Sequence, residues 1–195
     1  MRQAAIERST TETQISVLLD LDGTGESQIQ TSCGFLDHML TLLARHAMMS
    51  LHVTCQGDIM VDDHHTAEDL GICLGQALRQ ALGDKRGIRR YGSCALPMDE
   101  ALVLAALDLS GRGLLTYAMQ IPAQKVGTFD TELTEEFFIA LCREAGMTLH
   151  IRQLCGHNSH HLIEAAFKGF ARALREAASP DERLGGALPS TKGIL

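Results

Sequence analysis

The sequence lacks the features of a membrane or secreted protein. Its longest apolar run, Ala101–Leu107, is far too short for a transmembrane helix, which needs about 20 apolar residues. The first residues, Met1–Glu7, contain no apolar core of the kind found in signal peptides. We therefore expect a cytosolic protein.

Tryptophan, paired cysteines and an excess of positive charge are also missing. The six cysteines are scattered without a Cys-x-x-Cys motif, which argues against disulfides and against a cysteine zinc site. The formal charge of −7 argues against a general nucleic-acid surface, which needs a basic stripe. The composition is otherwise that of a globular protein, and 195 residues suffice for one substantial core or two small fused lobes.

The most informative feature is a histidine pattern that occurs twice. His64–His65 is followed by Glu68, and His160–His161 is followed by Glu164 at the same spacing. On a helix, residues four apart share a face, whereas adjacent residues diverge by about 100°. The first histidine of each pair can therefore bind a metal ion together with its glutamate, while the second points elsewhere. The simpler alternative is that these histidines only begin two helices.

Apolar patterns predict the same order of elements in each half of the chain. The expected strands are 13–19, 27–31, 50–56, 91–97, 102–109, 114–121 and 147–155, and the expected helices are 35–47, 66–82, 132–145 and 160–178. We predict an α+β fold with an internal duplication, in which each half is a four-stranded, mostly antiparallel sheet with two helices on one face. The first repeat covers residues 1–88 and the second 89–195, within one compact duplicated domain.

Asp20–Thr24 has the letters of the haloacid-dehalogenase phosphatase motif, in which the first aspartate is the nucleophile. That motif should follow a buried parallel strand and open into a helix. Here another predicted strand follows, so we interpret Asp22–Gly23 as a hairpin turn that joins two neighbouring strands.

Two further ligand candidates emerge when the halves are aligned on Leu51–His52 and Leu149–His150. The alignment sets His38 opposite Glu136, each in the first helix of its half. Taken alone, His38 is interpreted as a core histidine and Glu136 as a surface carboxylate. Their equivalence makes both candidates for metal binding.

A series of ordered motifs then resembles the imidazoleglycerol-phosphate dehydratase family over nearly the whole chain, from about residue 4 to residue 193. The matching segments are Glu7–Arg8, Glu12–Thr13, Phe35–Leu40, Asp62–Asp69, Leu96–Glu100, Asp108–Arg112, His157–His161 and Pro189–Gly193.

The resemblance implies a duplicated α+β fold, two Mn²⁺ ions in each active site, and a 24-subunit shell assembled with this metal. The implied reaction removes water from imidazole-glycerol phosphate to give imidazole-acetol phosphate in histidine biosynthesis. Many members of the family have histidine where this chain has Glu136. A carboxylate is also a competent manganese ligand, so we expect this metal site to persist with one more negative charge.

The resemblance also implies roles for further residues. Glu12 matches a carboxylate on the substrate side that shuttles protons, and with the metal-bound Glu68 and Glu164 it is a candidate catalytic residue. The positions that match the phosphate-binding residues of the family are Arg90, Arg112, Lys168, Ser190 and Lys192.

The two metal sites should be related by the internal repeat, with the second histidine of each pair crossing to the opposite site. One ion would take His64, Glu68, His161 and Glu136, and the other would take His160, Glu164, His65 and His38. These ligands need not all belong to one subunit.

The chemistry separates the leading hypothesis from its alternatives. Metals on both nitrogens of a substrate imidazole would favour its anionic form, which can expel the neighbouring hydroxyl, and would lie roughly 6 Å apart. A binuclear phosphohydrolase would instead hold its ions closer, around a metal-bound water. A third possibility is a shell in which the histidines and metal only join subunits.

Overall fold

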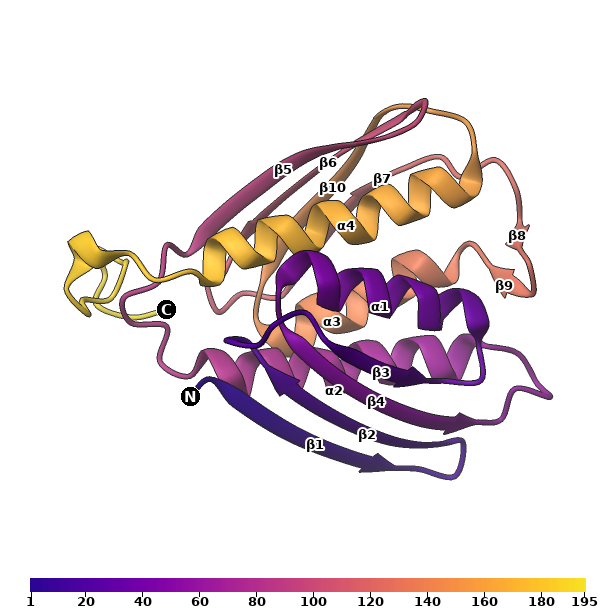
Figure 1. Cartoon of the computed structure of the whole chain (residues 1–195), viewed down its shortest axis with the longest axis horizontal. Coiled ribbons are helices and arrows are strands. Elements are labelled where there is room, and N and C mark those ends of the chain that lie inside the picture. The colour runs from indigo at the N-terminus through magenta and orange to yellow at the C-terminus, as the bar shows by residue number, and fades with distance from the viewer.

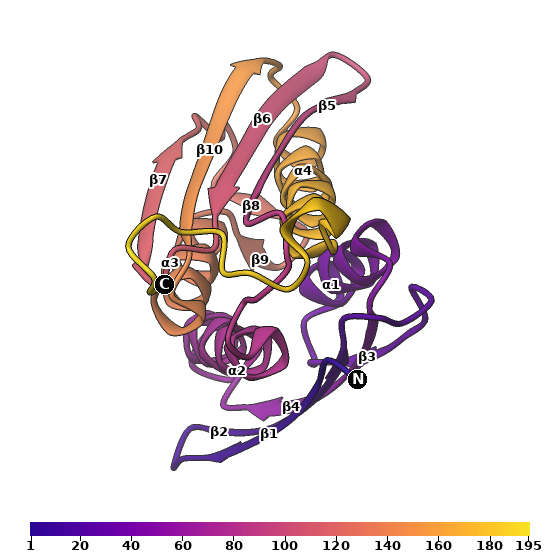
Figure 2. The ribbon, with the colours of Figure 1, turned by 90° about the vertical axis from the view of Figure 1, so that its left-hand side faces the viewer.

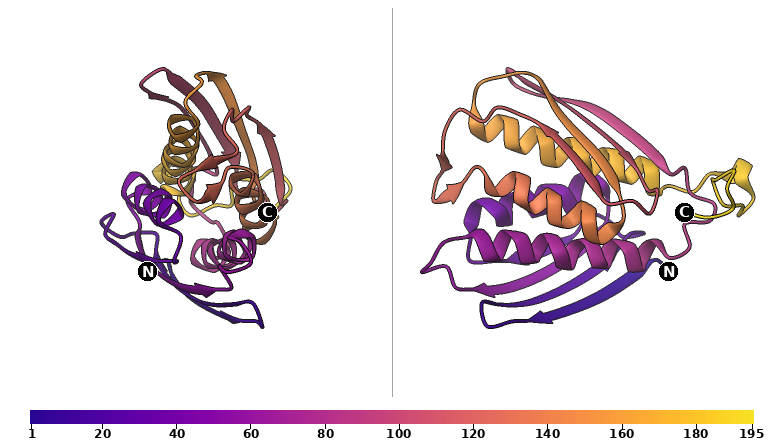
Figure 3. Two further views of the ribbon diagram at one scale, coloured as in Figure 1. Left: turned by 90° about the vertical axis from the view of Figure 1, so that its right-hand side faces the viewer. Right: turned by 180° about the vertical axis from the view of Figure 1, so that it is seen from behind.

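The computed structural model describes the whole chain, Met1–Leu195, as two four-stranded sheets with four α-helices between them (Figure 1). The sheets form the outer layers and the helices the inner ones. Each helix packs with one side against its own sheet and with another against a helix of the other half. The turned views in Figure 2 and Figure 3 show the same layering.

The two halves repeat the same elements. In the first half these are β1 (Gln3–Ser9), β2 (Thr13–Asp20), β3 (Ser27–Gln30), α1 (Gly34–Ala47), β4 (Ser50–Gly57) and α2 (His64–Leu82). In the second half they are β5 (Tyr91–Met98), β6 (Ala101–Asp108), β7 (Leu114–Ala118), the short β8 (Lys125–Val126) and β9 (Phe129–Asp130), α3 (Leu133–Ala145), β10 (Thr148–Cys155), α4 (Ser159–Ala178) and the 3-10 helix η1 (Glu182–Leu184).

The sheets have equivalent topologies. Their strand orders are β1-β2-β4-β3 and β5-β6-β10-β7. In each sheet the first three strands are antiparallel, and the last strand, β3 or β7, runs parallel to its neighbour. The predicted duplicated α+β fold, with a mostly antiparallel sheet and two helices in each half, is confirmed.

The predicted hairpin at Asp22–Gly23 is wrong. A turn does form there, with the Gly23 N–H donating to the Asp20 carbonyl at 3.3 Å, but β4 lies between β2 and β3. A Cβ on Gly23 would fall 2.3 Å from the backbone nitrogen of Ser50, the first residue of β4. The turn therefore carries the chain past the start of β4, and β3 pairs with the far side of that strand.

Each helix of the inner layers packs through a buried apolar face. Leu36, Met39, Leu40 and Leu43 line one face of α1 and are at most 1% exposed, as the apolar periodicity of this segment predicts. None of the four helices combines the length and the apolar character that crossing a membrane requires.

The packing of helix pairs places their starts together. Gly71 and Gly75 on α2 face Phe137–Leu141 and Leu141–Ala145 of α3 respectively, so these two helices run side by side in the same direction. The helices α1 and α4 do likewise, and all four begin at one end of the molecule (Figure 1). We call this the ligand end, comprising the first two turns of α1–α4 and the β1–β2 and β5–β6 turns.

The opposite end contains the C-terminal segment. The Gly87 N–H donates to the Ala187 carbonyl at 3.0 Å, which fixes this segment beside the link between α2 and β5. We call residues 83–90, 109–113 and 179–195 the tail end (Figure 1). The boundary predicted at residue 88 lies within that link.

Candidate active site

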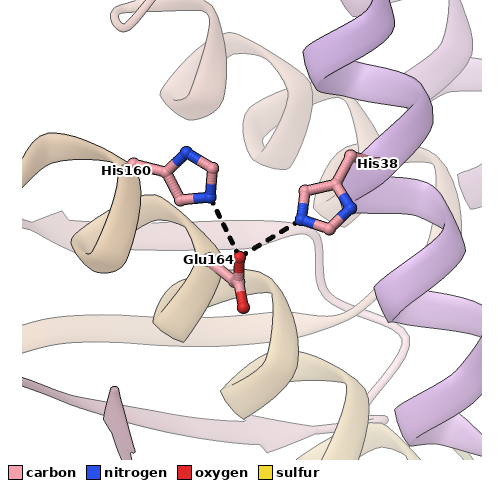
Figure 4. Close-up of side chains that lie close together, drawn as sticks. All are labelled: His38, His160 and Glu164. Carbon is pink, nitrogen blue, oxygen red and sulfur yellow. Dashed lines mark hydrogen bonds and ion pairs between the residues drawn. The ribbon is translucent and has the colours of Figure 1, made fainter. Parts of the chain in front are cut away.

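Three of the predicted metal ligands meet between α1 and α4 at the ligand end (Figure 4). His160 Nε2 lies 3.1 Å from Glu164 Oε2, one turn along the same helix. His38 Nε2 reaches the same oxygen from α1 at 3.2 Å. One ligand atom of each residue lies within 4.8 Å of the other two, so two imidazoles and a carboxylate converge from both halves of the chain.

Glu164 is the buried member of this group, with 5% of its surface exposed. Burial raises the pKa of its carboxyl, but hydrogen bonds from Lys168, His160 and His38 outweigh burial and leave that pKa below its ordinary value. An ionised carboxylate in the interior needs a compensating cation, and Lys168 Nζ contacts Oε1 of Glu164.

The group of His38, His160 and Glu164 also fits a divalent metal. Two imidazoles and a carboxylate form a donor set suited to Mn²⁺, Fe²⁺ or Zn²⁺.

Local structure holds the group in place. The Asn158 side chain accepts a hydrogen bond from the His161 N–H at 3.2 Å and caps α4, which sets His160 in the first turn. The Phe35 ring packs edge-on against the His160 ring, with centroids 5.3 Å apart. The His38 side chain is 47% exposed and is therefore not a satisfied core histidine.

The equivalent residues on α2 and α3 do not converge in this way. His64 Nε2 lies 3.8 Å from Glu68 Oε2, and Arg143 of α3 approaches Glu68 at 4.0 Å. The Glu136 side chain makes no hydrogen bond or ion pair and joins no ligand group within the chain. Its role as a ligand stays a prediction.

The second histidine of each pair points away from these groups, as helix geometry predicts. His65 Nδ1 lies 3.0 Å from the Asp58 carboxylate, and His161 Nδ1 lies 2.7 Å from Glu100. These hydrogen bonds raise the pKa of both histidines. The bond from His161, with a backbone bond from Asn158, lowers the pKa of Glu100 to about 2.

The sequence assigned no site role to Asp58 or to Glu100. The repeat contains a signal for Glu100, because this residue directly precedes β6 just as Glu12 directly precedes β2. The Glu12 carboxylate is half exposed and lies 3.8 Å from His65 Nε2. The predicted catalytic carboxylate thus stands at the ligand end, beside a predicted metal ligand.

Two of the predicted phosphate-binding cations gather at the tail end. Arg90 forms an ion pair with Asp108 at 2.7 Å and donates to the Pro189 carbonyl at 2.8 Å. Arg112 lies 3.6 Å from the same aspartate, and its guanidinium is largely exposed. Asp108 therefore aligns two cations beside the C-terminal segment.

Not all of the remaining predicted phosphate-binding residues lie at the tail end. Ser190 and Lys192 lie in the C-terminal segment, where the Lys192 N–H donates to Ser190 Oγ at 3.2 Å. Lys168 lies in the middle of α4, where it contacts Glu164. The 20 residues of α4 span about 30 Å, so the tail end and the ligand end of one chain are separate places.

Comparison with known proteins agrees with this geometry. The family model for imidazoleglycerol-phosphate dehydratase matches residues 31–174. The chain is 62% identical to the imidazoleglycerol-phosphate dehydratase of Paracoccus denitrificans and 60% identical to that of Cereibacter sphaeroides, over the full length of both chains in each comparison.

Solved structures give the same result. The imidazoleglycerol-phosphate dehydratase of Staphylococcus aureus is 43% identical, with a TM-score of 0.84 over 92% of this chain and 99% of that one. The enzyme from Pyrococcus furiosus is 38% identical, with a TM-score of 0.84 over 97% of this chain and 100% of that one. The chain therefore belongs to the imidazoleglycerol-phosphate dehydratase family, whose members are hydro-lyases.

Proposed function

We propose that this protein removes water from imidazole-glycerol phosphate to give imidazole-acetol phosphate, with two Mn²⁺ ions in each active site, as a cytosolic step of histidine biosynthesis. The observation that carries the proposal is the convergence of His38, His160 and Glu164 in a member of this dehydratase family. The cations of the tail end add a site suited to a phosphate group.

The residues that would hold the metals are those assigned from the repeat. His38, His160 and Glu164 would bind one ion with His65, and His64, Glu68 and Glu136 would bind the other with His161. A metal held there would supply Lewis acidity that favours the anionic form of the substrate imidazole, which eases departure of the neighbouring hydroxyl. Histidine nitrogens and glutamate oxygens together suit manganese.

The other side chains position the substrate and move protons. Arg112 presents an exposed guanidinium to the phosphate, while Arg90 is fixed by Asp108 and by the Pro189 carbonyl. Glu12 has free access to solvent and stands beside His65, where its carboxylate is proposed to take up and return protons at the glycerol carbons.

The separation of the two ends supports an active site shared between subunits. The C-terminal segment of a chain lies beyond the end of α4, at the opposite end of the molecule from its histidines. A substrate whose imidazole lies at the ligand end of one chain therefore requires the phosphate-binding tail of another copy. His65 and His161 point outward and belong to no ligand group within the chain, so they likewise require a metal ion that other residues help to hold. We propose that the chain assembles with manganese into a 24-subunit shell.

A turnover assay with metal-stripped and manganese-restored protein tests the function. Stripped protein is expected to be inactive, and restored protein is expected to form the ketone product from imidazole-glycerol phosphate. Release of inorganic phosphate, or full activity without metal, would contradict the proposal.

Size-exclusion chromatography of the same samples tests assembly: chelation should convert the large particle into a smaller oligomer. A large particle that stays intact without metal would refute the role of manganese in assembly.

A further inference from the structure

Two carboxylates outside every predicted set hold the outward-pointing histidines. Both Asp58 oxygens lie close to His65 Nδ1, at 3.0 and 3.1 Å. Glu100 Oε2 lies 2.7 Å from His161 Nδ1. The carboxylate contacts the same ring nitrogen in both halves, although the two carboxylates come from different places in the repeat.

These contacts fix which nitrogen carries the proton. An ionised carboxylate can only accept, so Nδ1–H is the donor in each imidazole. In the neutral ring, which is the form that binds a metal, the Nε2 atom then keeps its lone pair. Its nearest carboxylates, Glu12 for His65 at 3.8 Å and Asp99 for His161 at 3.5 Å, form no hydrogen bond with it. Each ring therefore presents a free Nε2 at the ligand end.

Further hydrogen bonds anchor the backbone of Asp58 and the carboxylate of Glu100. The Asp58 N–H donates to the Glu12 carbonyl at 3.1 Å, which ties the end of β4 to the β1–β2 turn. Glu100 Oε1 accepts from the backbone N–H groups of His157 and Asn158, at 3.2 and 2.7 Å. The Glu100 carboxylate therefore cannot reorient without breaking hydrogen bonds in the loop that leads into α4, and the position of the Asp58 backbone beside His65 is fixed.

We infer that Asp58 and Glu100 are positioning residues, which hold His65 and His161 in the Nδ1–H tautomer and aim Nε2 at the metal group of another subunit. This inference rests on the proposed function, in which both histidines bind manganese. Metal-binding histidines in general donate their second ring N–H to a carboxylate or carbonyl, and losing that partner typically weakens metal binding about 10–100-fold. The chain contains this arrangement at two places, at histidines that do not belong to the group of His38, His160 and Glu164.

Nitrogen NMR of histidine-labelled, metal-stripped protein tests the tautomer directly. At a pH above the raised pKa values of His65 and His161, where both rings are neutral, the wild-type chain should show a proton on Nδ1 and none on Nε2. Asp58→Ala should change only the His65 signals, and Glu100→Ala only those of His161. A wild-type protein with protonated Nε2 on either ring would overturn the inference, whatever its activity.

Calorimetric titration of the same proteins with Mn²⁺ alone tests the consequence. We expect affinity to fall about 10–100-fold in Asp58→Ala and Glu100→Ala. The control Asp84→Asn, which removes one charge from an exposed aspartate at the tail end, should bind like wild type. Because Glu100→Ala also loses two loop hydrogen bonds, Asp58 provides the cleaner comparison, since both of its carboxylate oxygens contact only His65 Nδ1. In Asp58→Asn the amide oxygen can still accept from Nδ1, so its affinity should recover in part.

The outcomes separate the two proposals. Tight binding by wild type with equal affinity in both alanine variants would overturn the positioning role and leave the proposed function standing. A wild-type protein that binds no Mn²⁺ would overturn both.

Discussion

Asp69 joins α2 to the first strand through Arg8, with Oδ1 of the aspartate 2.9 Å from the guanidinium. The second oxygen of Asp69 accepts a hydrogen bond from the Thr13 hydroxyl at 2.5 Å. Asp69 is 7% exposed and directly follows Glu68, a predicted metal ligand. This ion pair therefore holds the β1–β2 turn, which contains Glu12, against the start of α2.

Replacing Asp69 by alanine should destabilise the fold. The change leaves the Arg8 charge and the Thr13 hydroxyl without their partner. Breaking a fully buried ion pair costs about 3–5 kcal/mol, and partial solvent access at Arg8 reduces our estimate to about 2 kcal/mol of unfolding free energy. Urea denaturation measures the change. The control Asp84→Ala breaks an exposed pair with Arg86 and should cost less than about 0.5 kcal/mol; equal effects would refute the argument.

Gly71→Ala should also destabilise the protein, although alanine is the better helix former. A Cβ at this position would fall 2.5 Å from the Phe137 carbonyl oxygen, so α2 and α3 would have to separate, at a cost of about 1–3 kcal/mol. Gly169, in the middle of α4, provides the matched control because its nearest neighbour would be 3.4 Å away. Gly169→Ala should be neutral or slightly stabilising by thermal unfolding. Loss of stability there, with none at Gly71, would contradict this account.

Lys192→Ala should impair substrate capture and spare the metal. The loss of a charge-assisted bond to phosphate, worth about 1.5–3 kcal/mol, should raise KM about 10–100-fold. Elemental analysis should find the manganese content unchanged, because Lys192 lies at the tail end. Arg86→Ala, which removes another exposed cation from that end, should leave KM close to the wild-type value. Metal loss in Lys192→Ala would contradict the assignment.

Lys85 should make stability depend on pH. It is 8% exposed, its ammonium group makes no ion pair, and burial lowers its pKa from 10.5. Between the lowered pKa and 10.5 the unfolded chain binds more protons, so stability should rise with pH through that window. Lys85→Met should therefore be more stable than wild type at neutral pH, and the difference should shrink as pH approaches 10.5. Arg86→Met, which removes a cation that stays charged, should show no such trend. A constant difference for Lys85→Met would refute the cause.

Local patterns predicted most of the fold. Apolar patterns and the duplicated order of elements gave the four helices and seven of the ten strands close to their observed limits, whereas β1 and the short β8 and β9 were not assigned any bounds. The place of β4 between β2 and β3 was not predictable in this way, because sheet order depends on pairing between residues distant in sequence. Asp22–Gly23 favours a turn, but a turn does not specify which strand lies beyond it.

The candidate site was likewise predictable only in part. The spacing of His160 and Glu164 on one helix follows from helix geometry and is confirmed by their 3.1 Å contact. The meeting of this pair with His38 depends on how α1 packs on α4, and only the repeat pointed to it. Glu100 contacts His161, which lies 61 residues further along the chain, and no local sequence motif predicts such a contact.

The separation of the ligand end from the tail end affects particles that contain two kinds of subunit. If the active site is shared between subunits as proposed, a chain with a defective tail would still offer intact histidines to a neighbour, and a chain with defective histidines would still offer an intact tail. In particles built from both, some active sites would then combine one intact part from each kind of subunit and regain activity. Two alleles that are each inactive alone would then complement one another, and a single damaged allele would lower activity in proportion to its share of subunits rather than abolish it.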